Sequence, residues 1–279
     1  MDTLVIIVVL GSALLHAVWN AIIKGGADKL YETVLKTNGG TLTALCILPF
    51  VPLPHPDSFP YLAATICIHF FYYLFIAYAY RGSDLSYAYT IMRGASPLFT
   101  ALATVFVLQH SLSGFGWAGV LLLSGGVLTL AVDAIRRGGF SLSATAIALG
   151  NALVIMGYTI VDGTGVRLAG NPVSYVCWGT FLHTFPILTF TLLTRGTAYF
   201  TYAAKRWHYG FLGGACSILA YGLALWGMTR APISMVAALR ETSVVFGVLF
   251  AVLFLKEKVT PARILAVALV LTGAAVMRL

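Results

Sequence analysis

Charged residues are scarce in this chain of 279 residues, and their scarcity decides the class of protein. Asp, Glu, Lys and Arg make up 9% of the residues, whereas a soluble domain has roughly a quarter. Hydrophobic residues make up 59%, and the mean hydropathy is +0.92. A globule in water is therefore excluded. The apolar residues form continuous blocks, which also excludes an alternating transmembrane β-barrel. The composition indicates an all-α polytopic membrane protein.

The chain is also poor in cysteine and in catalytic motifs. Its four cysteines are Cys46, Cys67, Cys177 and Cys216. Because none belongs to a CxxC pair or a zinc spacing, we expect buried apolar side chains and no metal site. No GxSxG, HExxH or GxGD motif is present, so we expect no enzyme and no cofactor, with an intramembrane enzyme as the alternative from another class. The net charge of +8 does not indicate a nucleic-acid partner, because in a membrane chain the position of charges matters more than their sum.

Ten apolar blocks have about the length that a helix needs to cross a bilayer, ~20 residues. Gly, Pro and polar residues separate them. The predicted spans cover residues 3–23, 31–52, 58–80, 85–108, 115–132, 143–168, 172–194, 207–229, 232–254 and 261–277. The first block follows Asp2 rather than a basic segment and has no small-x-small cleavage site. We therefore expect a retained span and not a signal peptide.

Positive charge is distributed unevenly over the predicted loops. Of the 17 Lys and Arg residues, twelve fall after odd-numbered spans, three fall after even-numbered spans, and two lie inside spans. The twelve are Lys24, Lys29, Lys36, Arg81, Arg136, Arg137, Arg195, Lys205, Arg206, Lys256, Lys258 and Arg263; the three are Arg167, Arg230 and Arg278. Because cytoplasmic loops are rich in Lys and Arg, both termini are expected on the outer side of a cell membrane.

The two halves of the chain match at a constant offset. Residues 89–110 align with residues 236–257, placing Arg93 on Arg240 and Ser96 on Ser243 without a gap. Each copy holds five predicted spans, so the second copy must enter the membrane in the opposite direction. We expect two inverted five-helix repeats, residues 1–138 and 139–279, around a central cavity, an architecture of secondary transporters.

Three segments resemble a known family. LQHSLSGFGWAGVLLLSGGVL, LKEKVTPARILAVALVLTGAAV and LLHAVWNAIIK are similar to the paired EamA domains of the drug/metabolite transporter superfamily. The resemblance covers nearly the whole chain. It implies a ten-helix carrier of a small molecule with both termini outside. A bacterial inner membrane is the expected location, and a monomer is expected to suffice, with a homodimer left open.

Two arginines lie deep inside predicted spans. Arg93 and Arg240 each follow about eight residues of span, or roughly 12 Å of helix rise, and a charge near the midplane costs on the order of 2.5–3.5 kcal/mol. Glu241 is adjacent to Arg240 and points about 100° away from it on a helix. We therefore expect Glu241 to neutralise Arg93 on the symmetry-related span, leaving Arg240 for substrate. A buried ion-pair network that only fixes helix packing is the alternative.

Polar and aromatic side chains repeat at helical spacing on several spans, which is typical of a cavity wall. The predicted substrate-binding residues are Arg240, His16, Asn20, Tyr72, Tyr73, Tyr158, Tyr221 and Trp226. The predicted charge-pair or proton-coupling residues are Arg93, Glu241 and Asp162.

This inventory favours an alternating-access carrier, with export as the expected direction, for a small polar or amphipathic metabolite. The excess of basic groups favours a carboxylate or phosphonate compound such as an amino acid, because the guanidinium fork binds such groups at two points. A carrier for cations or aromatic amines is the alternative, with cation–π contacts from the tyrosines.

Overall fold

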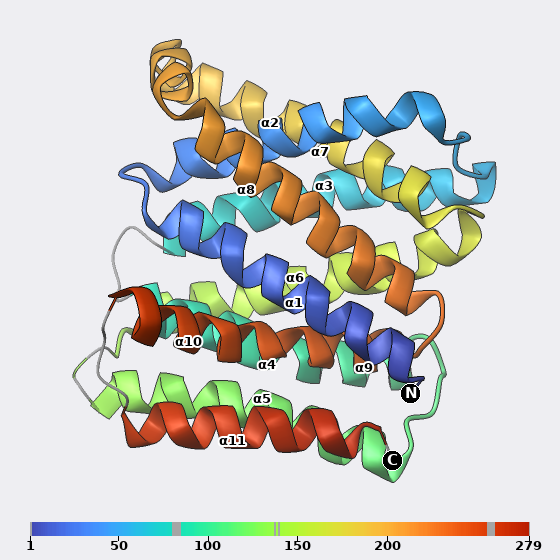
Figure 1. The fold of residues 1–279 in the computed structure, drawn as a ribbon, viewed down its shortest axis with the longest axis vertical. Helices are drawn as coiled ribbons and strands as arrows, with labels where there is room; N and C mark the ends of the chain where they lie inside the picture. Colours follow the sequence, from blue (N-terminus) through green and yellow to red (C-terminus); the bar gives the residue numbers. More distant parts are fainter. Residues whose placement is uncertain (1, 80–84, 137, 139, 256–259, 279) are drawn as a thin grey trace.

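The computed structural model describes residues 2–79, 85–136, 138, 140–255 and 260–278 (Figure 1). Within these ranges the secondary structure is entirely helical. The α-helices are α1 (Thr3–Lys24), α2 (Lys29–Ile47), α3 (Phe59–Ala79), α4 (Leu85–Phe106), α5 (Gly114–Arg136), α6 (Leu142–Leu168), α7 (Pro172–Arg195), α8 (Ala198–Met228), α9 (Ile233–Leu239), α10 (Ser243–Leu255) and α11 (Pro261–Val276). Three 3-10 helices are η1 (Leu48–Phe50), η2 (Pro56–Ser58) and η3 (Arg240–Thr242).

These helices follow the ten predicted spans closely, and α9, η3 and α10 together occupy the ninth. The prediction of a continuous ninth helix is wrong, because the backbone tightens to a 3-10 turn at Arg240–Thr242. By length and composition, seven of the described helical segments are able to cross a membrane. The fold is that of a polytopic helical membrane protein.

The eighth span begins earlier than predicted. Helix α8 starts at Ala198, so the basic KRWH segment is helical rather than a loop. The side chain of Arg206 is held there by an ion pair, Nε to Glu32 Oε1 at 2.5 Å. The assignment of Lys36 to a loop is also wrong, since it lies inside α2 and is 7% exposed. Without Lys36, the loops after odd-numbered spans still hold more Lys and Arg residues than the loops after even-numbered spans.

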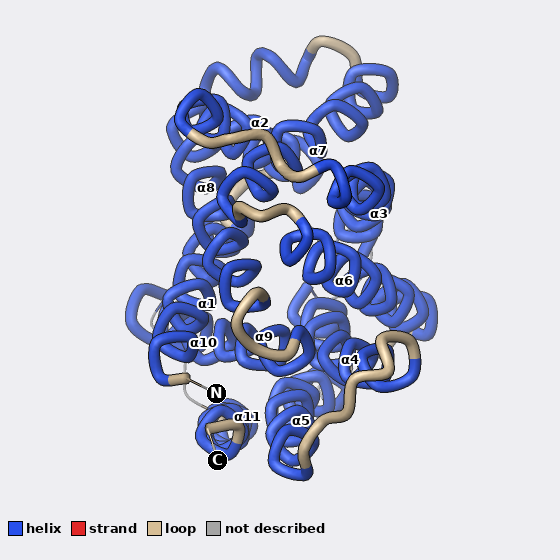
Figure 2. The backbone as a smooth tube through the Cα atoms, turned by 90° about the vertical axis from the view of Figure 1, so that its right-hand side faces the viewer, coloured by secondary structure: helices blue, strands red, loops and turns tan. Residues whose placement is uncertain are grey.

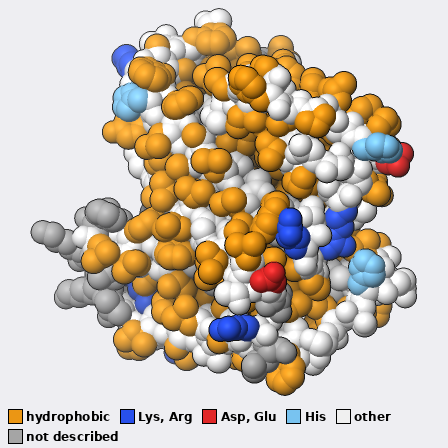
Figure 3. Space-filling view, turned by 45° about the vertical axis from the view of Figure 1, so that its right-hand side comes forward, with side chains coloured by type: hydrophobic (Ala, Val, Ile, Leu, Met, Phe, Trp, Pro, Cys, Tyr) orange, Lys and Arg blue, Asp and Glu red, His pale blue; other side chains and the backbone are white. Residues whose placement is uncertain are grey.

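The outer surface of the bundle is strongly apolar. Large exposed hydrophobic side chains, among them Ile7, Phe71 and Leu253, occur on many helices, and hydrophobic atoms dominate the face in Figure 3. Cys46 and Cys67 are exposed on this surface, so the expectation of four buried cysteines is wrong for these two. Their apolar character suits contact with lipid as well as a protein core.

The helix contacts follow the symmetry of a two-fold repeat. Under the sequence offset α1 corresponds to α6 and α3 corresponds to α8, so the α1–α8 and α3–α6 contacts are equivalent. Helix α1 packs on α8 while α3 packs on α6, and α5 packs on α11; Figure 2 shows α5 beside α11 near one end of the molecule. A Cβ atom on Gly126 would lie 2.9 Å from the carbonyl oxygen of Ala266, and one on Gly273 would lie 2.9 Å from that of Gly119. These two close contacts are equivalent under the sequence offset. Both termini lie at the same end of the helices (Figure 1).

Candidate functional site

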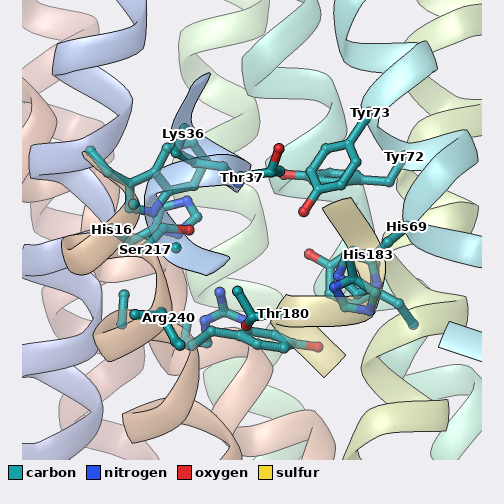
Figure 4. A pocket seen from close by; sticks show the side chains of 17 residues that line it. His16, Lys36, Thr37, His69, Tyr72, Tyr73, Thr180, His183, Ser217 and Arg240 are labelled. Atoms are coloured by element: carbon teal, nitrogen blue, oxygen red, sulfur yellow. The ribbon is translucent and has the colours of Figure 1, made fainter. Parts of the chain in front are cut away.

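A cavity lined by polar and aromatic side chains lies between the helices, and the unoccupied space in it, including the part open to solvent, is about 640 Å³. Six helices and η3 contribute to its wall (Figure 4). The lining residues are His16, Trp19, Lys36, Thr37, Gly40, His69, Tyr72, Tyr73, Tyr158, Thr180, His183, Gly214, Ser217, Ile218, Ala220, Tyr221 and Arg240. The structure therefore brings together six of the predicted binding residues: Arg240, His16, Tyr72, Tyr73, Tyr158 and Tyr221.

Basic side chains lie along one side of this cavity. In Figure 4, Lys36, His16 and Arg240 are arranged from top to bottom on the side opposite Tyr72 and Tyr73. The Lys36 ammonium lies 4.9 Å from the ring centroids of both Trp19 and Tyr73. Two aromatic faces attract a lysine cation but do not neutralise it. The positive charge of Lys36 therefore remains available to an anion.

Arg240 is buried and has little support from the protein. It is 7% exposed, and no described carboxylate forms an ion pair with it. Its guanidinium carbon lies 5.8 Å from the ring centroid of Tyr221, and its Nε has no hydrogen-bond partner among the described atoms. A buried guanidinium with an unused donor on a cavity wall is suited to bind an anionic ligand.

The neighbouring charges are paired with each other. The Nη2 atom of Arg93 on α4 lies 3.0 Å from Glu241 Oε1, and both side chains are almost fully buried. Gly94 stands in the first repeat where Glu241 stands in the second, so the structure has two buried arginines at this crossing and one carboxylate. Because the 3-10 turn separates the directions of Arg240 and Glu241, one lines the cavity and the other contacts α4.

Asp162 is enclosed by hydroxyl groups rather than exposed to the cavity. Thr65 Oγ1 donates to Asp162 Oδ2 at 2.8 Å, and the Tyr175 hydroxyl donates to Oδ1 at 2.9 Å. Tyr221 donates a further hydrogen bond to Oδ2. The carboxylate is 1% exposed and does not belong to the cavity lining. It is linked to the cavity wall directly by Tyr221 and, through Thr65, by His69.

Two histidines stack at the edge of the cavity. The rings of His69 on α3 and His183 on α7 have centroids 4.1 Å apart and planes inclined by 19°. His69 Nδ1 lies 2.9 Å from Thr65 Oγ1 and 3.1 Å from the Thr65 carbonyl oxygen. The His183 Nε2 atom is buried with no hydrogen-bond partner among the described atoms.

Two of the predicted binding residues lie elsewhere. The Asn20 amide donates to the His16 carbonyl oxygen at 2.8 Å. Trp226 packs against the apolar core, with the guanidinium carbon of Arg230 4.6 Å from its ring centroid. Neither side chain lines the cavity. Asn20 shares a helical stripe with His16, so spacing alone does not separate it from the cavity wall, whereas Trp226 lies about 140° around α8 from Tyr221.

Three further lining residues, Lys36, His69 and His183, are not among the binding residues predicted from the sequence. Lys36 resembles a loop lysine near the end of an apolar block, and His69 is hidden in an aromatic stripe. One signal was present: the offset that aligns Arg93 with Arg240 also aligns Lys36 with His183 and Thr33 with Thr180. Four of these six matched residues, Arg240, Lys36, His183 and Thr180, line the cavity. No cluster of potential metal ligands occurs among the described residues.

The fold and this site define a polytopic helical membrane protein with a cavity between its helices. Residues 142–279 match the model of the EamA-like transporter family, and through this half the chain belongs to that family. A solved crystal structure of 17% sequence identity superposes with a TM-score of 0.77, covering 99% of this chain and 96% of that one. This likeness shows the fold alone.

A similarity to a curated protein is more local. The chain is 42% identical over 81 residues to the riboflavin transporter of Brucella anthropi. The matched segment spans 28% of this chain and 28% of that protein.

Proposed function

We propose that this protein is an alternating-access carrier for a small organic anion, a carboxylate or phosphonate with an aromatic or amphipathic body. The observation that supports this most strongly is the pair of cations in the cavity. Arg240 has no carboxylate partner among the described residues, and Lys36 contacts two aromatic rings. Two desolvated positive charges facing one cavity favour a negatively charged ligand.

The distribution of negative charge supports an anion over a cation. The cavity lining includes Lys36, Arg240 and three histidines but no Asp or Glu. Glu241 is paired with Arg93, and Asp162 accepts hydrogen bonds from three hydroxyl groups. A cationic amine would therefore meet like charges without a free carboxylate. An amino acid remains a candidate, with its carboxylate at Arg240 and its ammonium oriented toward tyrosine hydroxyls.

The aromatic wall favours a flat ring in the substrate. Tyr72, Tyr73, Tyr158 and Tyr221 all line the cavity, and offset or edge-to-face contacts between aromatic rings contribute ~0.5–1.5 kcal/mol each. The partial similarity to a riboflavin transporter makes riboflavin a second candidate, since its ring system is flat and its side chain is polar.

The protein is further proposed to reside in a bacterial inner membrane with both termini outside. The excess of Lys and Arg in loops after odd-numbered spans supports this orientation.

A panel of ligands with one shared ring system tests the substrate class. Thermal unfolding of the purified protein in detergent is measured with indole-3-acetate (anion), tryptophan (zwitterion), tryptamine (cation), indole-3-acetamide (neutral) and riboflavin. We expect indole-3-acetate to raise the unfolding temperature most, because a ligand that binds only the native state stabilises it. Stabilisation by tryptamine alone would contradict the proposal and support the amine carrier, and stabilisation by riboflavin alone would support the flavin alternative.

A further inference from the structure

We propose that the stacked His69–His183 pair is a proton-binding site, and that the carrier takes up one proton at His69 when an organic anion enters the cavity. This inference rests on the proposed function and adds a coupling ion to it. The two rings form part of the same cavity as Lys36 and Arg240. Figure 4 shows them on the side facing Lys36, His16 and Arg240.

The hydrogen bonds determine which ring nitrogen can accept a proton. The Thr65 hydroxyl has one hydrogen, which it donates to Asp162 Oδ2 at 2.8 Å. Its oxygen, like the Thr65 carbonyl oxygen, can then only accept from His69 Nδ1. The proton of neutral His69 is therefore on Nδ1, and the lone pair is on Nε2. A proton entering from the cavity binds Nε2.

The same hydrogen bonds stabilise the protonated state. When His69 becomes an imidazolium, its Nδ1–H remains bonded to Thr65, whose hydroxyl leads directly to the Asp162 carboxylate. A carboxylate that is linked to a histidine through one intervening hydroxyl group favours the protonated form of the ring. The His183 ring, stacked at 4.1 Å, cannot be protonated at the same time without strong repulsion. The pair therefore holds a single proton.

The charges around the pair link proton binding to anion binding. The titratable or charged groups that face it are Tyr72 and Tyr73 of α3, His16 of α1, Lys36 of α2, Tyr158 and Asp162 of α6, Tyr175 of α7, Tyr221 of α8 and Arg240 of η3, together with the Arg93–Glu241 pair of α4 and η3. In the empty cavity Lys36 and Arg240 oppose a further positive charge. An anion bound between them removes that opposition, so anion and proton bind with positive coupling, and the coupling is reciprocal.

A direct structural link joins the two sites. The guanidinium carbon of Arg240 lies 5.8 Å from the Tyr221 ring centroid, and the Tyr221 hydroxyl donates to the same Asp162 oxygen that accepts from Thr65. Tyr221 therefore contacts both Arg240 and Asp162, so a shift of Arg240 toward a ligand is expected to alter the hydrogen bond between Tyr221 and Asp162. His16 lines the cavity too, but its ring contacts the edge of Trp19, at 4.8 Å between centroids, and no described carboxylate forms an ion pair with it.

Proton uptake on ligand binding tests this inference. Indole-3-acetate is added to the purified protein in weakly buffered detergent solution containing a pH indicator, and its Kd is measured at several values between about pH 5 and 8. We expect close to one proton taken up per anion bound at the pH where the coupling is strongest. The affinity should rise as the pH falls, by up to about tenfold per pH unit. Binding of the neutral indole-3-acetamide should cause no proton uptake by the protein.

Variants locate the proton. His69→Gln should bind the anion with a Kd that no longer changes with pH, while His208→Gln, an exposed histidine on α8, should behave as the wild type. Thr65→Val should shift the midpoint of uptake to lower pH, because the link to Asp162 is lost; a purely structural role would not move this midpoint. Full uptake in His69→Gln, or its loss in His16→Gln instead, would overturn the assignment.

The wild-type measurement separates the two proposals without any variant. If no anion of the panel binds at any pH, the proposed function fails. If an anion binds but no proton is taken up, the carrier function stands and the proton site is wrong.

Discussion

At the scale of single residues, the described part of the molecule differs from an ordinary apolar bundle by two buried cations, Arg240 and Lys36, that have no carboxylate in an ion pair with them. Arg93 and Arg240 occupy equivalent positions in the two repeats, but Glu241 pairs only with Arg93 at 3.0 Å. A buried charge without a partner is costly unless a ligand or water supplies one. The proposed binding of an anion at Arg240 would supply such a partner.

Replacing Arg240 tests this role. Arg240→Ala is expected to weaken indole-3-acetate binding at least tenfold while leaving the unfolding temperature nearly unchanged, because it removes an unpaired charge. Arg240→Lys should restore binding only in part, since lysine has the charge without the two-point fork. Arg136→Ala, an exposed arginine at the end of α5, is the control. If Arg240→Ala unfolds early and binds normally, Arg240 is a packing residue.

Replacing Glu241 should affect stability more than ligand binding, the reverse of what we expect for Arg240. Glu241→Ala leaves Arg93 buried without its carboxylate, and removing one partner of such a pair costs ~3–5 kcal/mol in soluble proteins. We expect a markedly lower unfolding temperature in detergent. The double variant Arg93→Met with Glu241→Met should recover much of the loss. Equal stability of Glu241→Ala and wild type would show that the ion pair is dispensable.

At the scale of elements, glycine contacts determine how closely the helices approach. Glycines 125 and 126 are neighbours on α5, yet a Cβ on Gly126 would lie 2.9 Å from both Ala266 O and Val270 Cγ2 of α11, while one on Gly125 would meet nothing within 4 Å. Small residues at such contacts let helix backbones pack closely in lipid, where apolar burial adds little.

This pair of glycines offers a matched comparison. Gly126→Ala is expected to lower the free energy of unfolding by ~1–3 kcal/mol, as overpacking does. Gly125→Ala should be neutral or stabilise by up to ~1 kcal/mol, because alanine favours the helix. Thermal unfolding in detergent measures both. A greater loss of stability in Gly125→Ala than in Gly126→Ala would show that the α5–α11 contact differs from the one described.

The elements were largely predictable and parts of the site were not. Long apolar blocks separated by turn residues defined the spans, because a bilayer requires continuous apolar helices. The 3-10 turn at Arg240–Thr242 has no Pro or Gly in it to signal it. Lys36 was misplaced because charge alone does not distinguish a flanking lysine from one held between aromatic rings. Contacts of Asp162 with Thr65, Tyr175 and Tyr221 join three other helices, which no local pattern in the sequence encodes.

At the scale of the whole molecule, the arrangement of positive charge predicts the orientation in the membrane. Both termini lie at one end of the bundle (Figure 1). We expect alkaline phosphatase fused to the C-terminus to be active and a fluorescent protein that folds only in the cytoplasm to be dark. The reverse pattern would invert the orientation and, with it, the side from which Lys36 is reached.

Counterflow in proteoliposomes tests directly whether Arg240 and Lys36 form the substrate site of a carrier for organic anions. Vesicles loaded with unlabelled indole-3-acetate are diluted into a trace of the labelled compound, and uptake is followed over time. We expect a transient accumulation of label above equilibrium in the wild type and in Arg136→Ala, and none in Arg240→Ala or in protein-free vesicles. Accumulation that is undiminished in Arg240→Ala, or wild-type vesicles that show counterflow with tryptamine but not with indole-3-acetate, would contradict it.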